Sequence, residues 1–357
     1  MIISKSQKIE NNYFPEINLN QVQSTSRPNI YFFLLDEYAG KTTLEKFYKY
    51  DNSNFYNELR KRKFYVAEKF SANYDKTPLC MASLFNMNYI KKETIYPFTT
   101  YNNYLKYFKA IKANPLFNFF QKHQIEIFNN SLFEINNTKK IFQFNNFPQV
   151  ENLIHKDIFH IKLWKSFAYI FVGGEFNVPY FFEKWIMKNH RNNKNIFKES
   201  IKISKHKTAK QKFVYSHVML PHAPYYCDSN GKVFSKKELG LKNKDAYIPY
   251  LIYTNKEILK LSDEIMKNDT NAILIYISDH GDRYAKSNSL KNEYNSHAFD
   301  NFFAIKTTSK NFENIKSNVN VFRVLLNTYF NQNLKMLNDT AFNFDERKNT
   351  TTVIEIK

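Results

Sequence analysis

The residues best suited to chemistry in this 357-residue chain directly follow an apolar run, Ile273–Ile277. They are Ser278, Asp279, His280 and Gly281. Such a run is typical of a strand buried on both faces of a parallel sheet, and the glycine indicates a sharp turn at its carboxyl end. Open α/β sheets bind ligands beyond the carboxyl ends of their strands. The adjacent carboxylate and imidazole therefore belong either to a site or to a solvated turn.

A second apolar run, Ile30–Leu35, ends in the same way, with Asp36 and Glu37 after it. Two strands that both end in acidic residues are less easily explained as coincidence than one. Carboxylates and a histidine that converge at strand ends form a plausible set of ligands for a divalent metal.

Thr77 lies in a polar turn, Ser71–Pro78, just before a segment that reads as a helix, Leu79–Asn88. Pro78 suits the first turn of that helix. A hydroxyl at this place is ordinarily an N-cap. Because a helix amino end also favours bound anions, Thr77 is equally placed to be a nucleophile facing a phosphate-like group.

His222 lies between two prolines, in Pro221-His222-Ala223-Pro224, after the strand candidate Phe213–Val218. The prolines restrict the backbone around it, which suits an imidazole presented to a binding site. The alternative is a buried histidine in a turn. The scattered residues His155, His160 and His190 are expected to be ordinary surface or core histidines.

The composition limits the partners. The formal net charge is +19, which is compatible with nucleic acid, a membrane surface or phosphate-bearing substrates. The lysines are scattered without a dense basic block, and we find no zinc-finger spacing or clear nucleic-acid-binding motif. We therefore expect solvated lysines and no nucleic acid partner.

The other bulk features also exclude some classes of protein. Cys80 and Cys227 are too few for a disulfide framework. The longest apolar stretch outside the predicted strands, near Leu163–Gly174, is too short to span a bilayer. The polar segment 1–27 lacks the apolar region of a signal peptide and reads as a leader or linker.

The remaining pattern alternates strands and helices, which predicts an α/β fold. Strands are expected at Ile30–Leu35, Phe64–Ala67, Ile125–Phe128, Phe213–Val218, Ile273–Ile277 and Phe302–Lys306, with an edge strand at Val353–Ile356. Helices are expected at Thr42–Lys63, Leu79–Asn88, Tyr101–Gln121, Ile154–Val172, Val178–His190, Ile248–Lys267 and Val319–Tyr329, with Trp164 and Trp185 as core anchors and Pro249 in a first turn.

Three segments together resemble the metal-site segments of the alkaline phosphatase–sulfatase superfamily: Asn29–Glu37, Asn73–Asn86 and Ile273–Gly281. Pro221-His222-Ala223-Pro224 is similar to the P-H-x-P turn of its sulfatase-like branch. The resemblance covers Pro28 to about Lys306. It implies a three-layer α/β/α fold with a central, mostly parallel sheet, like that of alkaline phosphatase.

The nucleophile segment departs from that of true sulfatases, which reads C-x-P-x-R. Here it reads T-P-L-C-M-A-S-L, so that Thr77 replaces the sulfatase Cys or Ser, Leu79 the proline and Met81 the arginine. Threonine cannot be converted to formylglycine, which argues against ordinary sulfate-ester hydrolysis. A threonine here resembles the lipoteichoic acid synthases and phosphoethanolamine transferases, which act through a covalent phospho-threonine.

The resemblance also implies roles for individual residues. Asp36, Asp279 and His280 would hold one divalent ion, Zn, Mn, Mg or Ca, with Glu37 as a possible further ligand. Thr77 would attack phosphorus. The resemblance further implies that His222 and His297 contact phosphate oxygens or protonate the leaving group, and that Arg283 adds positive charge beside the substrate.

From this resemblance we expect residues 28–330 to form the catalytic domain, preceded by the leader 1–27 and followed by an extension, 331–357. The expected function is a metal-dependent phosphotransferase or phosphodiesterase. The alternatives are a sulfuric or phosphoric ester hydrolase and a binding module without turnover. The implied substrate is a phosphate or sulfate ester, such as a phospholipid or cell-surface glycan, at the outer face of a bacterial envelope, with a membrane surface as a further partner.

Overall fold

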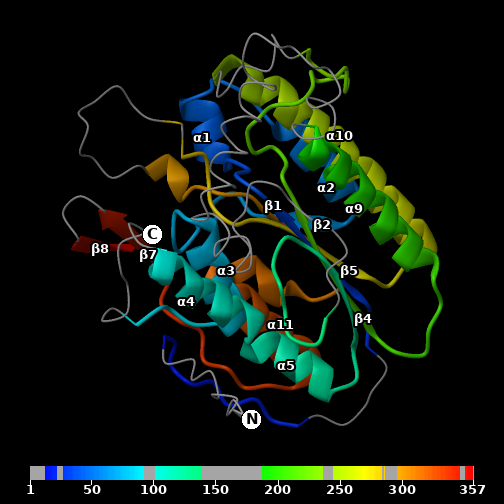
Figure 1. Cartoon of the computed structure of the whole chain (residues 1–357). Coiled ribbons are helices and arrows are strands. Elements are labelled where there is room, and N and C mark those ends of the chain that lie inside the picture. Colours follow the sequence, from blue (N-terminus) through cyan, green and yellow to red (C-terminus); the bar gives the residue numbers. More distant parts are fainter. Residues whose placement is uncertain are drawn as a thin grey trace, which may run out of the picture.

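The structure is a computed structural model that describes residues 13–21, 27–91, 101–138, 187–235, 244–283, 285, 296–345 and 350–356. A six-stranded sheet lies at its centre (Figure 1). Its strands, in the order β2-β6-β5-β1-β4-β3 across the sheet, are β2 Phe64–Val66, β6 Phe303–Lys306, β5 Ile273–Ser278, β1 Ile30–Leu35, β4 Lys212–Val218 and β3 Glu126–Asn130.

Most of the sheet is parallel. β1 pairs in parallel with β4 on one side and β5 on the other, and β3 pairs in parallel with β4. β6 is antiparallel to both of its neighbours. Every residue of β1 and β5 is buried, which explains why these strands are uninterrupted apolar runs rather than alternating ones.

Helices cover both faces of the sheet (Figure 1). On one face α9 and α2 both contact α10; their bounds are α2 Ser53–Lys61, α9 Lys188–Lys205 and α10 Lys244–Asn268. On the other face α3 contacts three helices; the four are α3 Thr77–Asn86, α4 Tyr101–Lys112, α5 Pro115–Lys122 and α11 Val321–Phe330. The predicted α/β class with a central, mostly parallel sheet is confirmed.

The predicted long helices are interrupted. Thr42–Lys63 is two helices, α1 Lys41–Lys46 and α2, because Lys49 turns the backbone at a φ of 55°. Tyr101–Gln121 is also two helices, because the Asn114 side chain accepts a hydrogen bond from the Phe117 N–H and caps a new helix at Pro115. This is ordinary N-cap chemistry.

Two further expectations differ from the structure. α10 begins at Lys244, so Pro249 lies inside the helix rather than in its first turn. The predicted edge strand at Val353–Ile356 instead belongs to β8, Thr350–Glu355, which pairs with β7, Thr340–Asp345, in a separate two-stranded sheet. The predicted helix Ile154–Val172 lies outside the described residues, as do Trp164 and Trp185 and all of Val178–His190 before Met187.

Candidate metal centre

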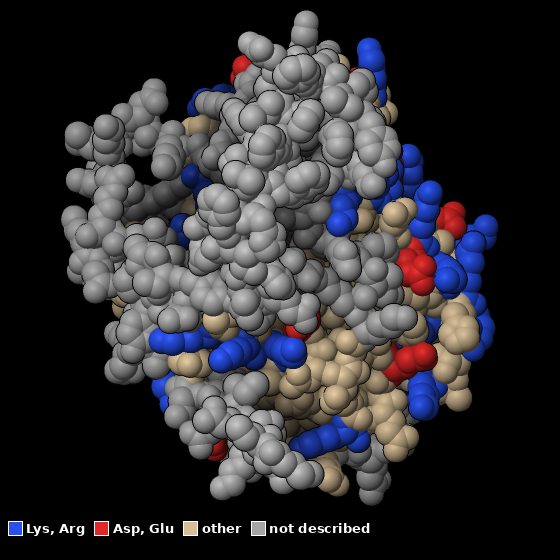
Figure 2. All heavy atoms as spheres, in the orientation of Figure 1, with Lys and Arg blue, Asp and Glu red and all other residues tan. Residues whose placement is uncertain are grey.

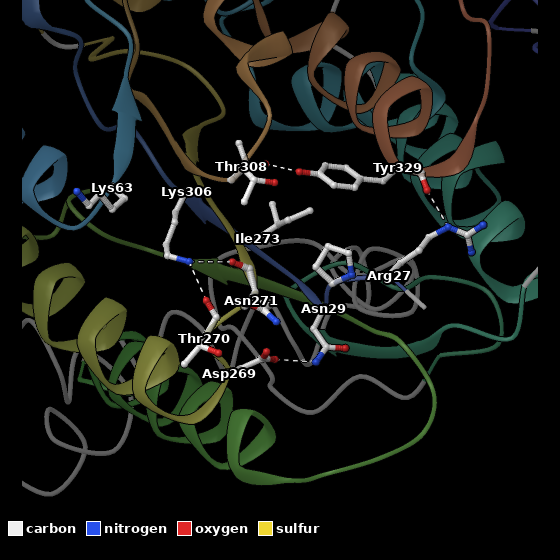
Figure 3. A pocket seen from close by; sticks show the side chains of 13 residues that line it. Arg27, Asn29, Lys63, Asp269, Thr270, Asn271, Ile273, Lys306, Thr308 and Tyr329 are labelled. Carbon is white, nitrogen blue, oxygen red and sulfur yellow. Dashed lines mark hydrogen bonds between the residues drawn. The ribbon is translucent and has the colours of Figure 1, made fainter. Parts of the chain in front are cut away.

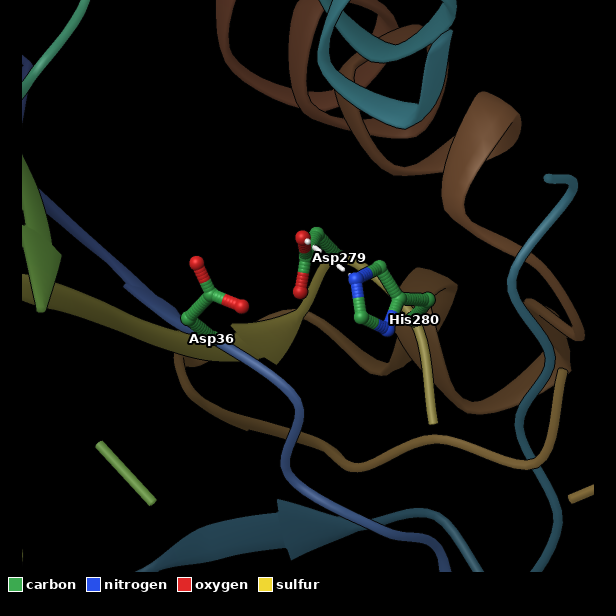
Figure 4. Close-up of side chains that lie close together, drawn as sticks. All are labelled: Asp36, Asp279 and His280. Carbon is green, nitrogen blue, oxygen red and sulfur yellow. Dashed lines mark ion pairs between the residues drawn. The ribbon is translucent and has the colours of Figure 1, made fainter. Parts of the chain in front are cut away.

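Three of the predicted site residues meet at the carboxyl edge of the sheet. β1 and β5 are in register, with Leu35 opposite Ser278, so the next residues, Asp36 and Asp279, emerge side by side. One carboxylate oxygen of each and one ring nitrogen of His280 all lie within 4.8 Å of one another (Figure 4). All three side chains are fully buried.

The turn after β5 is built for close packing. A Cβ on Gly281 would lie 2.1 Å from the His297 carbonyl oxygen and 2.2 Å from that of Asp300, so only glycine fits here. The Gly281 N–H donates to the Ala298 carbonyl at 2.8 Å. The Ser278 hydroxyl accepts from the Tyr38 N–H at 2.9 Å and donates to the His280 carbonyl at 2.5 Å. These contacts fix the backbone that carries the site.

His280 is held in one tautomer. Its Nδ1–H donates to the Gly281 carbonyl at 2.8 Å, which leaves the lone pair on Nε2. Burial, aided by the charge of Arg283, lowers the pKa of His280 to about 4, so the ring is neutral at pH 7. A neutral imidazole oriented by a backbone carbonyl is the form that binds metals.

Thr77 faces His280. Its Oγ1 lies 3.3 Å from His280 Nε2, and the side chain is buried. Thr77 is the first residue of α3, and the N-cap position belongs to Lys76, whose side chain makes no cap hydrogen bond. The threonine hydroxyl is therefore directed to the site rather than used as the N-cap that its sequence position first suggested.

The two aspartates repel each other. Burial tends to raise the pKa of Asp36, but the nearby His222, His217 and His280 outweigh it and lower that pKa. Burial and the charge of Asp36 raise the pKa of Asp279 to about 6. Two adjacent buried carboxylates are costly unless a positive group lies between them.

The donor atoms fit a divalent metal. Asp36 Oδ1 and Asp279 Oδ2 are buried and accept no hydrogen bond, although buried polar atoms are nearly always bonded. Two such carboxylate oxygens and one imidazole nitrogen are ligands that Zn²⁺ and related ions use. The residues present are therefore suited to the ion that the sequence predicts.

The sequence analysis missed His217, a site neighbour. Its Nε2 lies 3.1 Å from Asp36 Oδ2, and both side chains are fully buried. His217 occupies the place in β4 opposite Leu34 of β1. In the sequence, the indication of this role was a histidine at the second-last position of an apolar strand.

Glu37 bridges two other predicted residues. Its Oε2 lies 3.6 Å from His222 Nε2, and its Oε1 accepts from the Arg283 N–H at 3.2 Å and lies 3.4 Å from Arg283 Nε. Burial tends to lower the pKa of His222, but Asp36 and Glu37 outweigh it and raise that pKa. Glu37 thus holds the guanidinium of Arg283 and the imidazole of His222 beside the residue that follows β1, Asp36. It is not one of the three residues whose ligand atoms come together.

His297 is placed differently from the other predicted residues. Its Nδ1 lies 3.1 Å from Thr43 Oγ1, and its ring packs against Phe47 at 5.3 Å between centroids. Only the backbone carbonyl of His297 approaches the site, where it lies against Gly281. A direct contact of its imidazole with substrate remains a prediction.

A separate cavity of about 610 Å³ lies at the amino ends of β1 and β5, the edge of the sheet opposite the candidate metal centre (Figure 3). Two of its cationic side chains are used by the fold. Arg27 Nε donates to the Tyr329 carbonyl at 2.7 Å, and Lys306 Nζ donates to the Thr270 carbonyl at 3.1 Å. We attach no chemistry to this cavity. Among the described helices, none is long and apolar enough to cross a membrane.

Comparisons with known proteins identify a matching family and solved structures of similar fold. The sequence model of the family described as Sulfatase matches residues 50–301. The C-terminal periplasmic domain of EcEptC from Escherichia coli, in complex with Zn, is similar with a TM-score of 0.55 and 12% identity, and 94% of each chain is covered. No curated protein sequence matches the chain.

Two solved hydrolases have the same fold. The phosphonate monoester hydrolase of Agrobacterium radiobacter has a TM-score of 0.50 and 11% identity, with 90% of this chain and 82% of that chain covered. BT1596, a 2-O GAG sulfatase, has a TM-score of 0.50 and 9% identity, with 85% and 70% covered. At such identities the likeness establishes the fold alone.

Proposed function

The chain belongs to the sulfatase family of the alkaline phosphatase–sulfatase superfamily, and from this premise we propose that it is a metal-dependent phosphotransferase or phosphodiesterase acting through Thr77. The single observation that carries the proposal is the position of the Thr77 hydroxyl, 3.3 Å from Nε2 of His280, whose ring belongs to the group of ligand atoms formed with Asp36 and Asp279. Family membership supports an enzyme, and the geometry supports this residue as its nucleophile.

Asp36, Asp279 and His280 would hold the metal. A divalent ion bound there would lower the pKa of a nearby hydroxyl and neutralise charge on the transferred group. The family match and the Zn complex of the EcEptC domain support a divalent ion. His217 would keep Asp36 oriented through its 3.1 Å contact with Oδ2.

The side chains divide the remaining work. Thr77 Oγ1 would lose its proton to solvent and form a bond to phosphorus as the bond from phosphorus to the leaving oxygen breaks. His222, whose pKa is raised by Asp36 and Glu37 against the effect of burial, would give the leaving oxygen a proton. Arg283 would contribute positive charge beside the phosphoryl oxygens. An acceptor hydroxyl would then give its proton to His222 and attack the same phosphorus, and the released Thr77 oxygen would regain a proton from solvent.

The first half-reaction is shared by transfer and hydrolysis, and only the acceptor differs. Threonine at residue 77 favours phosphorus over sulfur, because it cannot form formylglycine. Ester substrates in general agree with the fold relatives, which include a phosphonate monoester hydrolase and a 2-O GAG sulfatase. We propose a phosphodiester of the cell envelope, borne by a phospholipid or a surface glycan, as the substrate. The periplasmic EcEptC domain of the same fold supports this location.

The test is intact mass spectrometry of the metal-loaded protein after incubation with a nitrophenyl phosphodiester. We expect a covalent phosphoryl adduct that peptide mapping places on Thr77. Thr77→Ala should abolish the adduct and lower turnover by at least about 10³-fold, because the nucleophile is lost. Thr77→Ser keeps a hydroxyl and should retain the adduct.

Metal content and circular dichroism of Thr77→Ala provide the control for folding. Unchanged turnover in a folded, metal-loaded Thr77→Ala protein would refute the assignment of the nucleophile. Adding an alcohol acceptor then separates the two activities, because a transferase yields a new diester whereas a hydrolase yields only the water product. A wild-type protein with neither adduct nor turnover would favour the binding-module alternative.

A further inference from the structure

A line of positive charge runs along α9. Five exposed side chains, spaced three or four residues apart, form it: Arg191, Lys194, Lys198, Lys202 and Lys205. At 3.6 residues per turn they fall within roughly 80° of the helix circumference, and they extend over about 21 Å of its axis. We call these five residues the α9 stripe. Many basic side chains, with some acidic ones among them, lie along the side of the molecule where α9 and α10 lie (Figures 1 and 2).

The stripe is not explained by the general lysine content of the chain. The neighbouring helix α10 carries Lys244, Lys256, Lys260 and Lys267 but also Asp245, Glu257, Asp263 and Glu264. In α9 the only carboxylate is Glu199, which lies 3.5 Å from Lys202 Nζ. Like charges four residues apart destabilise a helix. The five cations of the stripe, with one carboxylate in the same helix, therefore destabilise α9 in a way that the equal numbers of lysines and carboxylates in α10 do not.

The charge of the stripe affects its surroundings. His190 belongs to the first turn of α9 and is buried. Burial together with the charges of Lys194 and Arg191 lowers the pKa of His190 to about 4. Burial and the charge of Arg191 also lower the pKa of Lys188. In both shifts burial is the larger cause, and the cations of the stripe add to it.

The amino-terminal half of the stripe lies by the carboxyl end of β4, at the edge of the sheet that carries the candidate metal centre. Asn193 Oδ1 accepts from the Met219 N–H at 2.8 Å, and Asn193 Nδ2 donates to the Met219 carbonyl at 3.1 Å. Met219 directly follows β4, and His222 comes three residues later. One end of the stripe therefore lies at the catalytic edge of the sheet, and the other end lies near the opposite edge.

We propose that the α9 stripe binds a linear polymer that carries repeated phosphate groups and guides it to the candidate active site. The binding part of the proposal is independent of the proposed function, whereas the destination of the polymer rests on it. A narrow line of cations matches the regular charge spacing of such a chain. A helix that lies in a membrane surface also exposes large apolar side chains. The apolar residues of α9 are instead buried, as for Ile196, Phe197 and Ile203, or partly buried, as for Ile201.

The test measures binding without turnover. Fluorescence anisotropy with labelled heparin and labelled inorganic polyphosphate would give the dissociation constants over a series of salt concentrations. The stripe variant is Lys194→Gln, Lys198→Gln and Lys202→Gln. The matched control, Lys260→Gln, Lys267→Gln and Lys310→Gln, removes the same charge from exposed residues outside the stripe, two of them on the neighbouring helix α10.

We expect the stripe variant to bind at least tenfold more weakly and to lose about two to three from the slope of log K against log salt, while the control variant stays near the wild type. Tighter binding of polyphosphate than of heparin supports the phosphate polymer, and tighter binding of heparin would overturn it. Equal binding by the wild type and both variants would overturn the proposal, as would binding to acidic phospholipid vesicles alone. An enzymatically inactive protein that still binds through the stripe would refute only the proposed function.

Discussion

At the scale of single residues, the adjacent carboxylates of Asp36 and Glu37 have different roles in the site. Asp36 and Glu37 are adjacent in sequence, but only Asp36 contributes to the group of metal-ligand atoms. Glu37 has a φ of 61°, a conformation that costs a residue with a Cβ about 1 kcal/mol or more. Its bonds to Arg283 and its contact with His222 hold it there. We therefore expect Glu37 to act as a positioning residue, although the sequence suggested it as a further metal ligand.

Glu37→Gln should separate these two roles. The amide oxygen can still accept from the Arg283 N–H, but the charge that holds His222 is lost. We expect turnover to fall by about 10- to 100-fold while metal affinity stays within a few-fold of the wild type. Isothermal titration with Zn²⁺ is the readout, and Asp279→Asn, which should weaken binding strongly, is the reference. If Glu37→Gln lost the metal as fully as Asp279→Asn, Glu37 would be a ligand after all.

At the scale of secondary structure, α9 places a neutral histidine beneath a row of cations. The pKa of His190 in the folded protein is about 4, below its ordinary value near 6.5. As the pH falls below 6.5 the unfolded chain takes up the proton first. Folding stability is therefore present above pH 6.5 and is lost as the pH falls towards 4, by up to about 3 kcal/mol.

His190→Phe should flatten this part of the stability profile. Phenylalanine keeps the ring contacts with Tyr226 and Tyr253, whose centroids lie 5.6 and 6.3 Å from that of His190. We expect the loss of unfolding free energy between pH 6.5 and 4, measured by urea titration at each pH, to be smaller in the variant by about 2–3 kcal/mol. Identical slopes in the two proteins would show that folding does not lower the pKa of His190.

The elements also show what sequence can predict. β1 and β5 were predicted within a residue, because an uninterrupted apolar run needs a position buried on both faces. β7 was not predicted, because Thr340–Asp345 forms a strand only where Phe342 packs on Tyr74 and Tyr89. The continuous helix α9 was not predicted beyond His190 either, so its lysines looked scattered. The lysines align only when the segment is helical, and the many polar residues of the segment hide the helical spacing of its apolar residues.

The residues of the candidate site could likewise be predicted where a local pattern marks them, but not where tertiary structure places them. Asp36, Thr77, Asp279 and His280 were predicted because each lies at the end of a recognisable strand or the start of a helix. His217 was missed, because its role depends on the register between β4 and β1, which places it beside Asp36. Side-chain partners across strands are tertiary facts that local patterns do not contain.

At the scale of the whole molecule, the metal centre would join segments distant in the chain. Asp36 follows β1, Asp279 follows β5 and Thr77 begins α3. Without a cation, the negative charges of Asp36 and Asp279 repel each other at the ends of β1 and β5. This repulsion contributes to the raised pKa of Asp279. An ion that binds only the folded protein stabilises it by mass action, by about 2.7 kcal/mol at a concentration 100 times Kd. We therefore expect Zn²⁺ to raise the melting temperature of the chelator-treated protein by several degrees.

The size of this shift should depend on pH. The folded-state pKa of Asp279 is raised to about 6, so its carboxylate is free to bind above that value, whereas below it the metal must displace a proton. Calorimetry should therefore show a larger Zn²⁺-induced shift at pH 7.5 than at pH 5. Asp279→Asn lacks the titrating carboxylate and should show little shift at either pH. An equal shift in the variant and the wild type would mean that Zn²⁺ stabilises the protein elsewhere, which would remove the support that Asp36, Asp279 and His280 give to a metal-dependent reaction at Thr77.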